Sequence, residues 1–193
     1  MNAAATRQHI IEAADELFYI QGFEATSFAD IAEKVGLSRG NFYYHFRTKD
    51  EILAAVIGHR QAKTDAMLSR WDAGNAPVDR IQGFIDLLLV NQIKIMSYGC
   101  PVGTLCNELS KLDHVSKEEA AGIFLLFRTW LARQFAALGR PDEADQLALH
   151  ILMRSQGVAT LATAFRDDDF IRREVAAMSE WVAMQASAVI SRS

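Results

Sequence analysis

Residues 26–49 read TSFADIAEKVGLSRGNFYYHFRTK, a pattern that predicts two short helices joined by a tight turn. Ser27 and Asp30 have the spacing of a capping box, which predicts the start of the first helix. Gly36 ends that helix, since glycine tolerates the backbone of a helix terminus. Ser38 follows as the cap of the second helix. Together these features predict a helix-turn-helix, a motif that binds DNA in many proteins.

The charge of this segment differs from that of the residues before it. Residues 34–49 hold four cations, Lys34, Arg39, Arg47 and Lys49, and no carboxylate. Residues 1–33 hold a single cation against six acids. The formal net charge of the chain is −4, which excludes a uniformly basic coat but allows a local basic patch. A duplex phosphate backbone is therefore expected to approach the second short helix and the start of the next one.

The two sides of the second short helix carry different chemistry. Phe42 and Phe46, four residues apart, are expected to pack against the preceding helices. The outer side holds donors, aromatic rings and a glycine: Arg39, Gly40, Asn41, Tyr43, Tyr44 and His45. Arginine and asparagine suit base edges in the major groove, whereas tyrosine, histidine and helix N-terminal amides suit phosphates. The alternative is an ordinary solvated helix face.

Helical periodicity extends over most of the 193-residue chain, which is 50% hydrophobic and 23% charged. Three prolines and eleven glycines are few for a sandwich or barrel of many short strands. We therefore predict an all-α fold of about nine helices. Besides the two short helices, they are expected before Gly22 and near residues 48–71, 78–98, 105–112, 116–138, 142–165 and 169–190.

The run from Thr26 to Leu53 closely resembles the TetR family of bacterial transcriptional regulators, and the match spans about residues 7–55. Its most specific part is a tyrosine pair followed by His-Phe and then a lysine three residues on. The resemblance implies a homodimer with a helix-turn-helix DNA-binding domain over residues 1–48. It also implies a helical effector-binding and dimerisation domain over residues 49–193, of which 49–71 form the linking helix. Such proteins usually repress, and a small-molecule effector releases them from a palindromic operator.

The resemblance also implies roles for individual residues. The expected DNA-binding residues are Thr26, Ser27, Ser38, Arg39, Gly40, Asn41, Tyr43, Tyr44, His45 and Lys49. Arg39, Gly40 and Asn41 fall where family members read bases. The tyrosine pair, His45 and Lys49 fall where they hold phosphates, and the threonine and serine at 26 and 27 fall at a phosphate-contacting helix start.

The helices expected over 78–98 and 116–138 have apolar arcs wider than the stripe of a surface helix. Such helices surround either a packed core or a cavity, and the family resemblance implies a cavity for the effector. Candidates for its wall are Trp71, Phe84, Leu88, Gln92, Met96, Cys100, Phe124, Phe127 and Arg128. The site would be mainly apolar, with a few polar anchors.

Two cysteines leave two interpretations open. Cys100 and Cys106 have five residues between them, which is not a zinc spacing, and no second Cys or His pair accompanies them. They are either structural thiols, since buried cysteine behaves as a small apolar residue, or the sensor of an oxidant or electrophile, as in some family members. No metal or other cofactor is expected.

The last two long helices are expected to form the dimer interface. The helix over 142–165 becomes rich in small residues toward its end, which permits close helix approach. The helix over 169–190 supplies apolar residues at helical spacing: Ile171, Val175, Met178, Trp181, Val182 and Val189. Part of this surface would face water in a monomer, so we predict a two-fold dimer. The alternative is that both helices close an intramolecular bundle.

Other classes of protein fit the sequence less well. A spanning helix needs roughly 20 apolar residues, the apolar run 84–96 contains polar and charged residues, and Met1–Glu12 lacks a signal-peptide pattern. A soluble cytoplasmic protein is therefore expected. An enzyme is not expected, because the sequence has no Glu-x-x-His pair and no glycine-rich phosphate loop. A DNA-binding regulator without a small-molecule effector remains an alternative.

Overall fold

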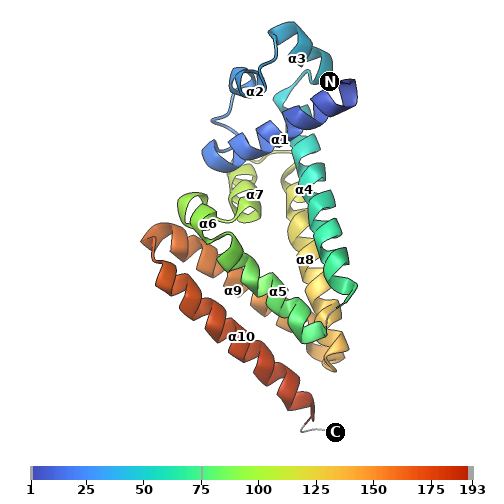
Figure 1. The fold of residues 1–193 in the computed structure, drawn as a ribbon, viewed down its shortest axis with the longest axis vertical. Coiled ribbons are helices and arrows are strands. Elements are labelled where there is room, and N and C mark those ends of the chain that lie inside the picture. Colours follow the sequence, from blue (N-terminus) through green and yellow to red (C-terminus); the bar gives the residue numbers. More distant parts are fainter. Residues whose placement is uncertain (1, 75, 191–193) are drawn as a thin grey trace. The chain divides into compact units, whose positions relative to one another are not determined.

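The computed structural model describes residues 2–74 and 76–190, with side chains as far as residue 187. Those residues form ten α-helices and one short 3-10 helix, with no strand among them (Figure 1). The helices are α1 (Ala3–Gln21), α2 (Phe28–Lys34), α3 (Arg39–His45), α4 (Lys49–Asp72), α5 (Pro77–Val90), α6 (Gln92–Tyr98), α7 (Pro101–Lys111), α8 (Lys117–Ala137), η1 (Pro141–Glu143), α9 (Ala144–Phe165) and α10 (Asp168–Ile190). The predicted all-α fold is confirmed. None of the described helices is long and apolar enough to cross a membrane.

The helix expected over residues 78–98 is divided into α5 and α6. Asn91 leaves the helical region, with φ −106° and ψ 11°. Its side-chain Nδ2 donates to the Leu87 carbonyl at 2.9 Å and shares this acceptor with its own backbone N–H, at 3.1 Å. The helix expected from residue 105 begins earlier, because α7 starts at Pro101, where the missing N–H and fixed φ of proline suit the first position of a helix.

The described chain divides into two compact units. The first contains Met1–Lys63 and Thr104–Ile123, and the second contains Thr64–Gly103 and Phe124–Ser193. The boundary between them falls within α4, α7 and α8. The first unit therefore holds the helix-turn-helix together with residues that are distant in the sequence.

The core of the first unit is built mainly from α1, α4 and the two short helices. Phe42 and Phe46 are 1% and 2% exposed, which confirms that this side of α3 packs inward. They belong to one cluster with Ile10, Ile11, Ala14, Leu17, Phe18, Phe23, Ile31, Ile52, Leu53, Val56, Ile57, Leu105, Leu109 and Ala120. Burial of the apolar side chains in this cluster holds α3 against the rest of the first unit.

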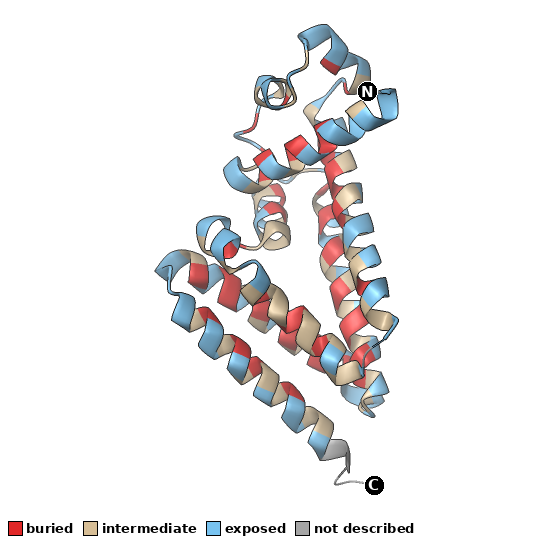
Figure 2. Ribbon diagram, in the orientation of Figure 1, coloured by how far each residue is buried: buried red, intermediate tan, exposed pale blue. Residues whose placement is uncertain are grey.

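In the second unit, α10 packs on α5 and α9. Ile171, Val175, Met178 and Val182, which the sequence analysis assigned to a dimer surface, are buried within this unit. Figure 2 shows the buried face of α10 as a red stripe, with exposed residues on the opposite side. Trp181 is half-buried, and the side chain of Val189 lies outside the described residues. Ile171, Val175, Met178 and Val182 thus close the unit's own core, and the predicted dimer must use other residues of α9 and α10.

Candidate nucleic-acid interface

Two caps and one glycine turn position α3. Ser27 N donates to Asp30 Oδ2 at 2.7 Å and Asp30 N donates to Ser27 Oγ at 3.2 Å, which confirms the predicted capping box of α2. Hydrogen bonding of the Asp30 carboxylate to the Ser27 backbone, and to a smaller extent to the Ser27 side chain, lowers the pKa of Asp30. Gly36 follows α2 with φ 65°, a backbone that favours glycine. Ser38 Oγ then accepts from Asn41 N at 3.5 Å and caps α3.

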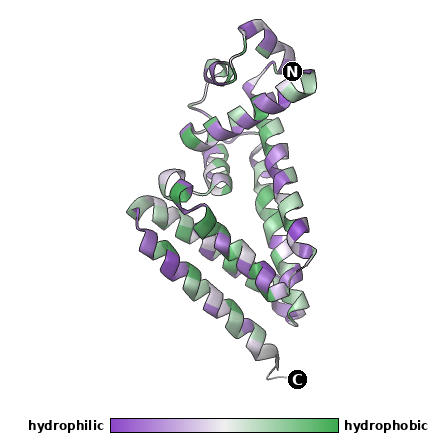
Figure 3. Cartoon of the chain, in the orientation of Figure 1, coloured by the Kyte–Doolittle hydropathy of each residue, from purple (hydrophilic) through white to green (hydrophobic). Residues whose placement is uncertain are grey.

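α3 is coloured largely hydrophilic in Figure 3, and the residues on its outer face are mostly exposed. Arg39, Gly40 and Asn41 are exposed. Tyr43 and Tyr44 are 43% and 79% exposed. His45 is half-buried, with its ring against that of Tyr44 at a centroid distance of 5.2 Å. This is the face that the sequence analysis expected to meet DNA.

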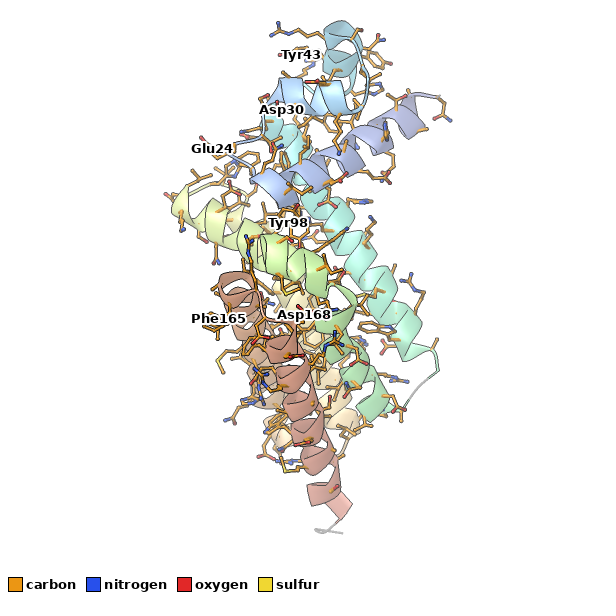
Figure 4. The ribbon with its side chains drawn as sticks, turned by 60° about the vertical axis from the view of Figure 1, so that its left-hand side comes forward. Glu24, Asp30, Tyr43, Tyr98, Phe165 and Asp168 are labelled. Atoms are coloured by element: carbon orange, nitrogen blue, oxygen red, sulfur yellow. The ribbon has the colours of Figure 1, made fainter. Side chains whose placement is uncertain are left out.

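A row of stacked side chains holds Arg39 on that face. The Arg39 guanidinium lies 5.9 Å from the centre of the Tyr43 ring. Tyr43 in turn stacks on Phe28, with centroids 5.4 Å apart and planes 19° apart, and Phe28 meets the edge of buried Phe42 at 5.2 Å. Figure 4 shows Tyr43 on α3 above α2, which carries Asp30. Phe28 thus supports the outer face of α3. The sequence analysis missed this role, and the only signal for it was the place of Phe28 as the first residue of α2.

Only part of the basic charge of residues 34–49 is available at the surface. Lys34 Nζ pairs with Glu16 Oε2 at 2.9 Å. Among the described residues, neither Arg39 nor Arg47 has a carboxylate within ion-pairing distance. Both side chains are exposed, so these two guanidinium groups carry the available positive charge of the motif.

Two predicted phosphate contacts are engaged inside the protein. Thr26 is fully buried, and its hydroxyl donates to the Gly22 carbonyl at 2.7 Å. Lys49 Nζ donates to the carbonyls of Phe23 and Glu24, at 3.0 and 3.1 Å, and lies 4.4 Å from the Phe23 ring centre. In this structure both groups stabilise the segment between α1 and α2. The exposed member of the threonine–serine pair is Ser27.

The fold does not require glycine at position 40. A Cβ at this position would meet no atom of the protein within 4 Å, and the residue is exposed in the first turn of α3. A glycine that the fold does not require fits a surface that another molecule approaches closely.

The expected effector residues all belong to the second unit, and the structure brings some of them together. Phe84 and Phe127 are buried side by side, with ring centroids 5.3 Å apart, and Leu88 is buried too. The other six are half-buried: Trp71, Gln92, Met96, Cys100, Phe124 and Arg128. The ring of Trp71 lies 5.6 Å from that of Trp130.

Gln92 and Arg128, two polar members of this set, differ in whether their polar atoms have hydrogen-bond partners. Gln92 Oε1 is buried and has no hydrogen-bond partner among the described residues. Arg128, by contrast, makes a bidentate pair with Asp145, at 2.8 and 2.6 Å. The hydrogen bond from Arg128 lowers the pKa of Asp145. The Arg128 guanidinium is thus held at the surface by Asp145, whereas Gln92 keeps an unused acceptor.

The two cysteines are half-buried thiols. Cys100 directly precedes α7, and its Sγ accepts a hydrogen bond from Gly103 N at 3.5 Å. This contact gives Cys100 the place of a helix cap. No group of three or more His, Cys, Asp or Glu side chains among the described residues is arranged to hold a metal ion.

Comparison with known proteins agrees with this geometry. Residues 10–56 match the family model described as bacterial regulatory proteins, tetR family. An HTH-type transcriptional regulator from the lacX 3′ region of Lactococcus lactis subsp. lactis is 30% identical over 174 residues, which cover 86% of this chain and 87% of that protein. The HTH-type transcriptional regulator TtgR of Pseudomonas putida is 39% identical over 87 residues, or 45% of this chain and 41% of that protein.

A solved structure resembles the whole chain. The crystal structure of a TetR transcriptional regulator from Legionella pneumophila superposes with a TM-score of 0.81 and 26% sequence identity. The superposition covers 95% of this chain and 98% of that one. The likeness therefore includes the helices that follow the helix-turn-helix as well as the motif itself.

Proposed function

Because the chain belongs to the TetR family of bacterial DNA-binding transcriptional regulators, we propose that it is a ligand-responsive repressor released from a palindromic operator by a small-molecule effector. Its relatives are transcriptional regulators, not enzymes. The observation that carries the proposal is the outer face of α3, which is exposed and holds a guanidinium group without a carboxylate partner among the described residues. A regulator of bacterial transcription acts in the cytoplasm, where the chromosome lies.

We assign base reading to the start of α3 and phosphate binding to its surroundings. Arg39 and Asn41 can pair with guanine and adenine edges in the major groove, and Gly40 allows the backbone to come close. Tyr44, His45 and Arg47 can bind phosphates on either side. Ser27 and Ser38 lie at helix starts, where backbone amides and the helix dipole favour anions.

Replacing Arg39 with alanine is expected to relax base preference at one position of each half-site, at a cost of about 1–3 kcal/mol there. The physical reason is the loss of a bidentate donor that Tyr43 holds in place. Selection of bound duplexes from random DNA, followed by sequencing, measures the preference.

Arg47→Ala is the matched control, because it removes the same charge from a residue that we assign to phosphate. It should weaken binding to all duplexes by a similar factor. It should also reduce the slope of log affinity against log salt concentration by about one. If Arg39→Ala selects the same motif as the unmodified protein with equal stringency, the assignment of base reading to Arg39 is wrong.

We propose that the outer faces of α9 and α10 form the two-fold dimer interface. Leu149, Met153, Leu161 and Phe165 are between 42% and 63% exposed. With Gly157, they repeat every four residues and follow one ridge of α9. A Cβ at Gly157 would meet nothing within 4 Å, so a partner helix has room to approach. Two α3 helices about 34–36 Å apart would then reach successive major grooves.

The effector proposal is supported by the second unit's apolar interior and by Gln92. An apolar molecule with one hydrogen-bond donor would match the side chains of Phe84, Leu88 and Phe127 and the unpartnered Gln92 oxygen. Binding that favours one arrangement of the two heads over another would couple effector to operator, typically by about 1–3 kcal/mol.

Gln92→Leu is expected to raise the free energy of unfolding of the effector-free protein by about 1–3 kcal/mol. The buried oxygen carries a desolvation cost that no hydrogen bond offsets, and leucine of similar size removes it. A residue kept for binding at the expense of stability behaves in this way. Urea unfolding at fixed protein concentration gives the value.

The control is Gln82→Leu on α5, where Gln82 Nε2 already donates to Asp86 Oδ1 at 2.7 Å. That change should leave stability unaltered or lower it. If Gln92→Leu also leaves the free energy of unfolding unaltered or lowers it, the Gln92 oxygen has a hydrogen-bond partner. Gln92 would then no longer be the proposed polar anchor for the effector.

A further inference from the structure

The segment between α1 and α2 is held by hydrogen bonds to both edges of its backbone. Phe23 N and Glu24 N donate to the two carboxylate oxygens of Glu108, each at 2.9 Å. On the other edge, Lys49 Nζ donates to the carbonyls of the same two residues, at 3.0 and 3.1 Å. We call these four hydrogen bonds the 23–24 clamp. Glu108 lies on α7, 85 residues after Phe23 in the sequence.

The surroundings of the clamp are fitted to it. The Phe23 ring is 2% exposed and meets the rings of Phe18 and His114 edge-on, at 5.3 and 5.2 Å. Gly22, which ends α1, has φ 94°, and a Cβ there would lie 3.0 Å from Glu108 Oε1. A side chain at position 22 would therefore strain the backbone and press on the carboxylate. Glycine at this point lets Glu108 reach both amides.

The clamped segment leads directly into the DNA-binding motif. Ser27, three residues after Glu24, caps α2, and α2 leads through the Gly36 turn into α3. Figure 4 shows Glu24 where α1 passes toward α2, and the position of this segment fixes where α2 begins. A change in the direction of the segment would thus alter the orientation of the face that carries Arg39.

We propose that Glu108 is a positioning residue for DNA binding: its carboxylate fixes the 23–24 segment and so pre-orients α2 and α3 for the duplex. This inference rests on the proposed role of α3. Glu108 is outside the helix-turn-helix, and α7 is one continuous helix from Pro101 to Lys111. A rotation or shift of α7 therefore moves the carboxylate and loosens or tightens the clamp.

Electrostatics and positioning predict opposite results for Glu108→Gln. Removal of a negative charge from a protein of net charge −4 should strengthen attraction to any duplex. Loss of the clamp should weaken binding, since the glutamine oxygen accepts one amide while its NH₂ group faces the other. We expect operator affinity to fall about tenfold, because the free protein no longer holds the binding conformation.

The experiment compares the unmodified dimer with Glu108→Gln on a duplex enriched from random DNA by the unmodified protein. Fluorescence anisotropy over a range of salt gives the affinity and its salt dependence, and amide hydrogen exchange reports on Phe23 and Glu24. Exchange at these two amides should accelerate about tenfold or more, as expected for the loss of hydrogen bonds to a charged group. The salt dependence and the selected base motif should stay unchanged, because no phosphate or base contact is removed.

Glu118→Gln is the matched control, since it removes the same charge from an exposed residue of α8. It should bind as tightly as the unmodified protein or slightly more tightly. If Glu108→Gln is too unstable to measure, Glu108→Asp, whose shorter side chain cannot span both amides, replaces it.

Unchanged exchange at Phe23 and Glu24, or affinity equal to that of the Glu118→Gln control, would overturn the role of Glu108. An unmodified protein that enriches no duplex would instead overturn the proposed function. The exchange measurement needs no DNA, so the two failures can be told apart.

Discussion

Met153→Arg is expected to convert the dimer into a monomer and to lower affinity for a duplex with two half-sites by about 10²–10⁴-fold. Met153 is 62% exposed and lies between Leu149 and Gly157 on the ridge of α9. Two arginines facing each other across a two-fold axis would repel and would lose water without gaining a partner. Each subunit would then bind one half-site alone, without the effective concentration that the linked second head provides.

Sedimentation at micromolar concentration measures the oligomeric state, and anisotropy on full and half operators measures the affinity. Leu125→Arg is the control, because Leu125 on α8 is 60% exposed and lies outside the proposed interface. It should remain dimeric. The proposed interface is wrong if Met153→Arg sediments as a dimer, or if Leu125→Arg is the variant that dissociates.

The helix-turn-helix could be predicted from the sequence because its signals are local. Ser27, Asp30 and Ser38 cap helices through hydrogen bonds that span three residues, and Gly36 supplies a positive φ within the same segment. The four-residue spacing of Phe42 and Phe46 likewise fixes which side of α3 is buried. These signals suffice to predict where the two short helices begin and which side of α3 is buried.

Contacts between residues that are distant in the sequence could not be predicted from it. Lys49 has the charge and the place of a phosphate ligand, but its ammonium group meets carbonyls 25 and 26 residues earlier. Arg128, which is predicted to line the effector pocket, pairs with Asp145, 17 residues later, and nothing in the sequence indicates this contact. Charge alone does not reveal whether a cation faces solvent or a partner that folding brings near. Glu108 was missed for the same reason.

Amphipathic helices show a second limit of prediction from the sequence. The apolar residues of α10 have helical spacing, which predicts that one face is buried but not what covers it. Packing on α5 and α9 covers that face within the subunit. The surface that we propose for a partner is therefore the mixed, exposed stripe of α9 and α10. Asn91 adds a third case, since its backbone leaves the helical region at a point where periodicity alone would continue the helix.

Asp15→Ala is expected to lower the free energy of unfolding by about 3–5 kcal/mol. Asp15 on α1 accepts a hydrogen bond from Arg60 Nε on α4 at 2.6 Å. The Arg60 side chain is only 9% exposed, so the substitution takes the Asp15 charge away from a guanidinium group that lies in the interior. Because the total stability of a domain is about 5–15 kcal/mol, this change should move the urea midpoint strongly at fixed protein concentration.

The double variant Asp15→Ala with Arg60→Met separates the two origins of that loss. If the cost comes from the desolvated charge of Arg60, the apolar replacement should restore most of the stability, since buried ion pairs are often no better than well-packed apolar side chains. If instead the pair stabilises by its own attraction, the double variant should be as unstable as Asp15→Ala. A loss below about 1 kcal/mol in the single variant would mean that water screens Arg60 as it screens a surface pair, and the connection between α1 and α4 would then depend mainly on their other contacts, chiefly apolar packing.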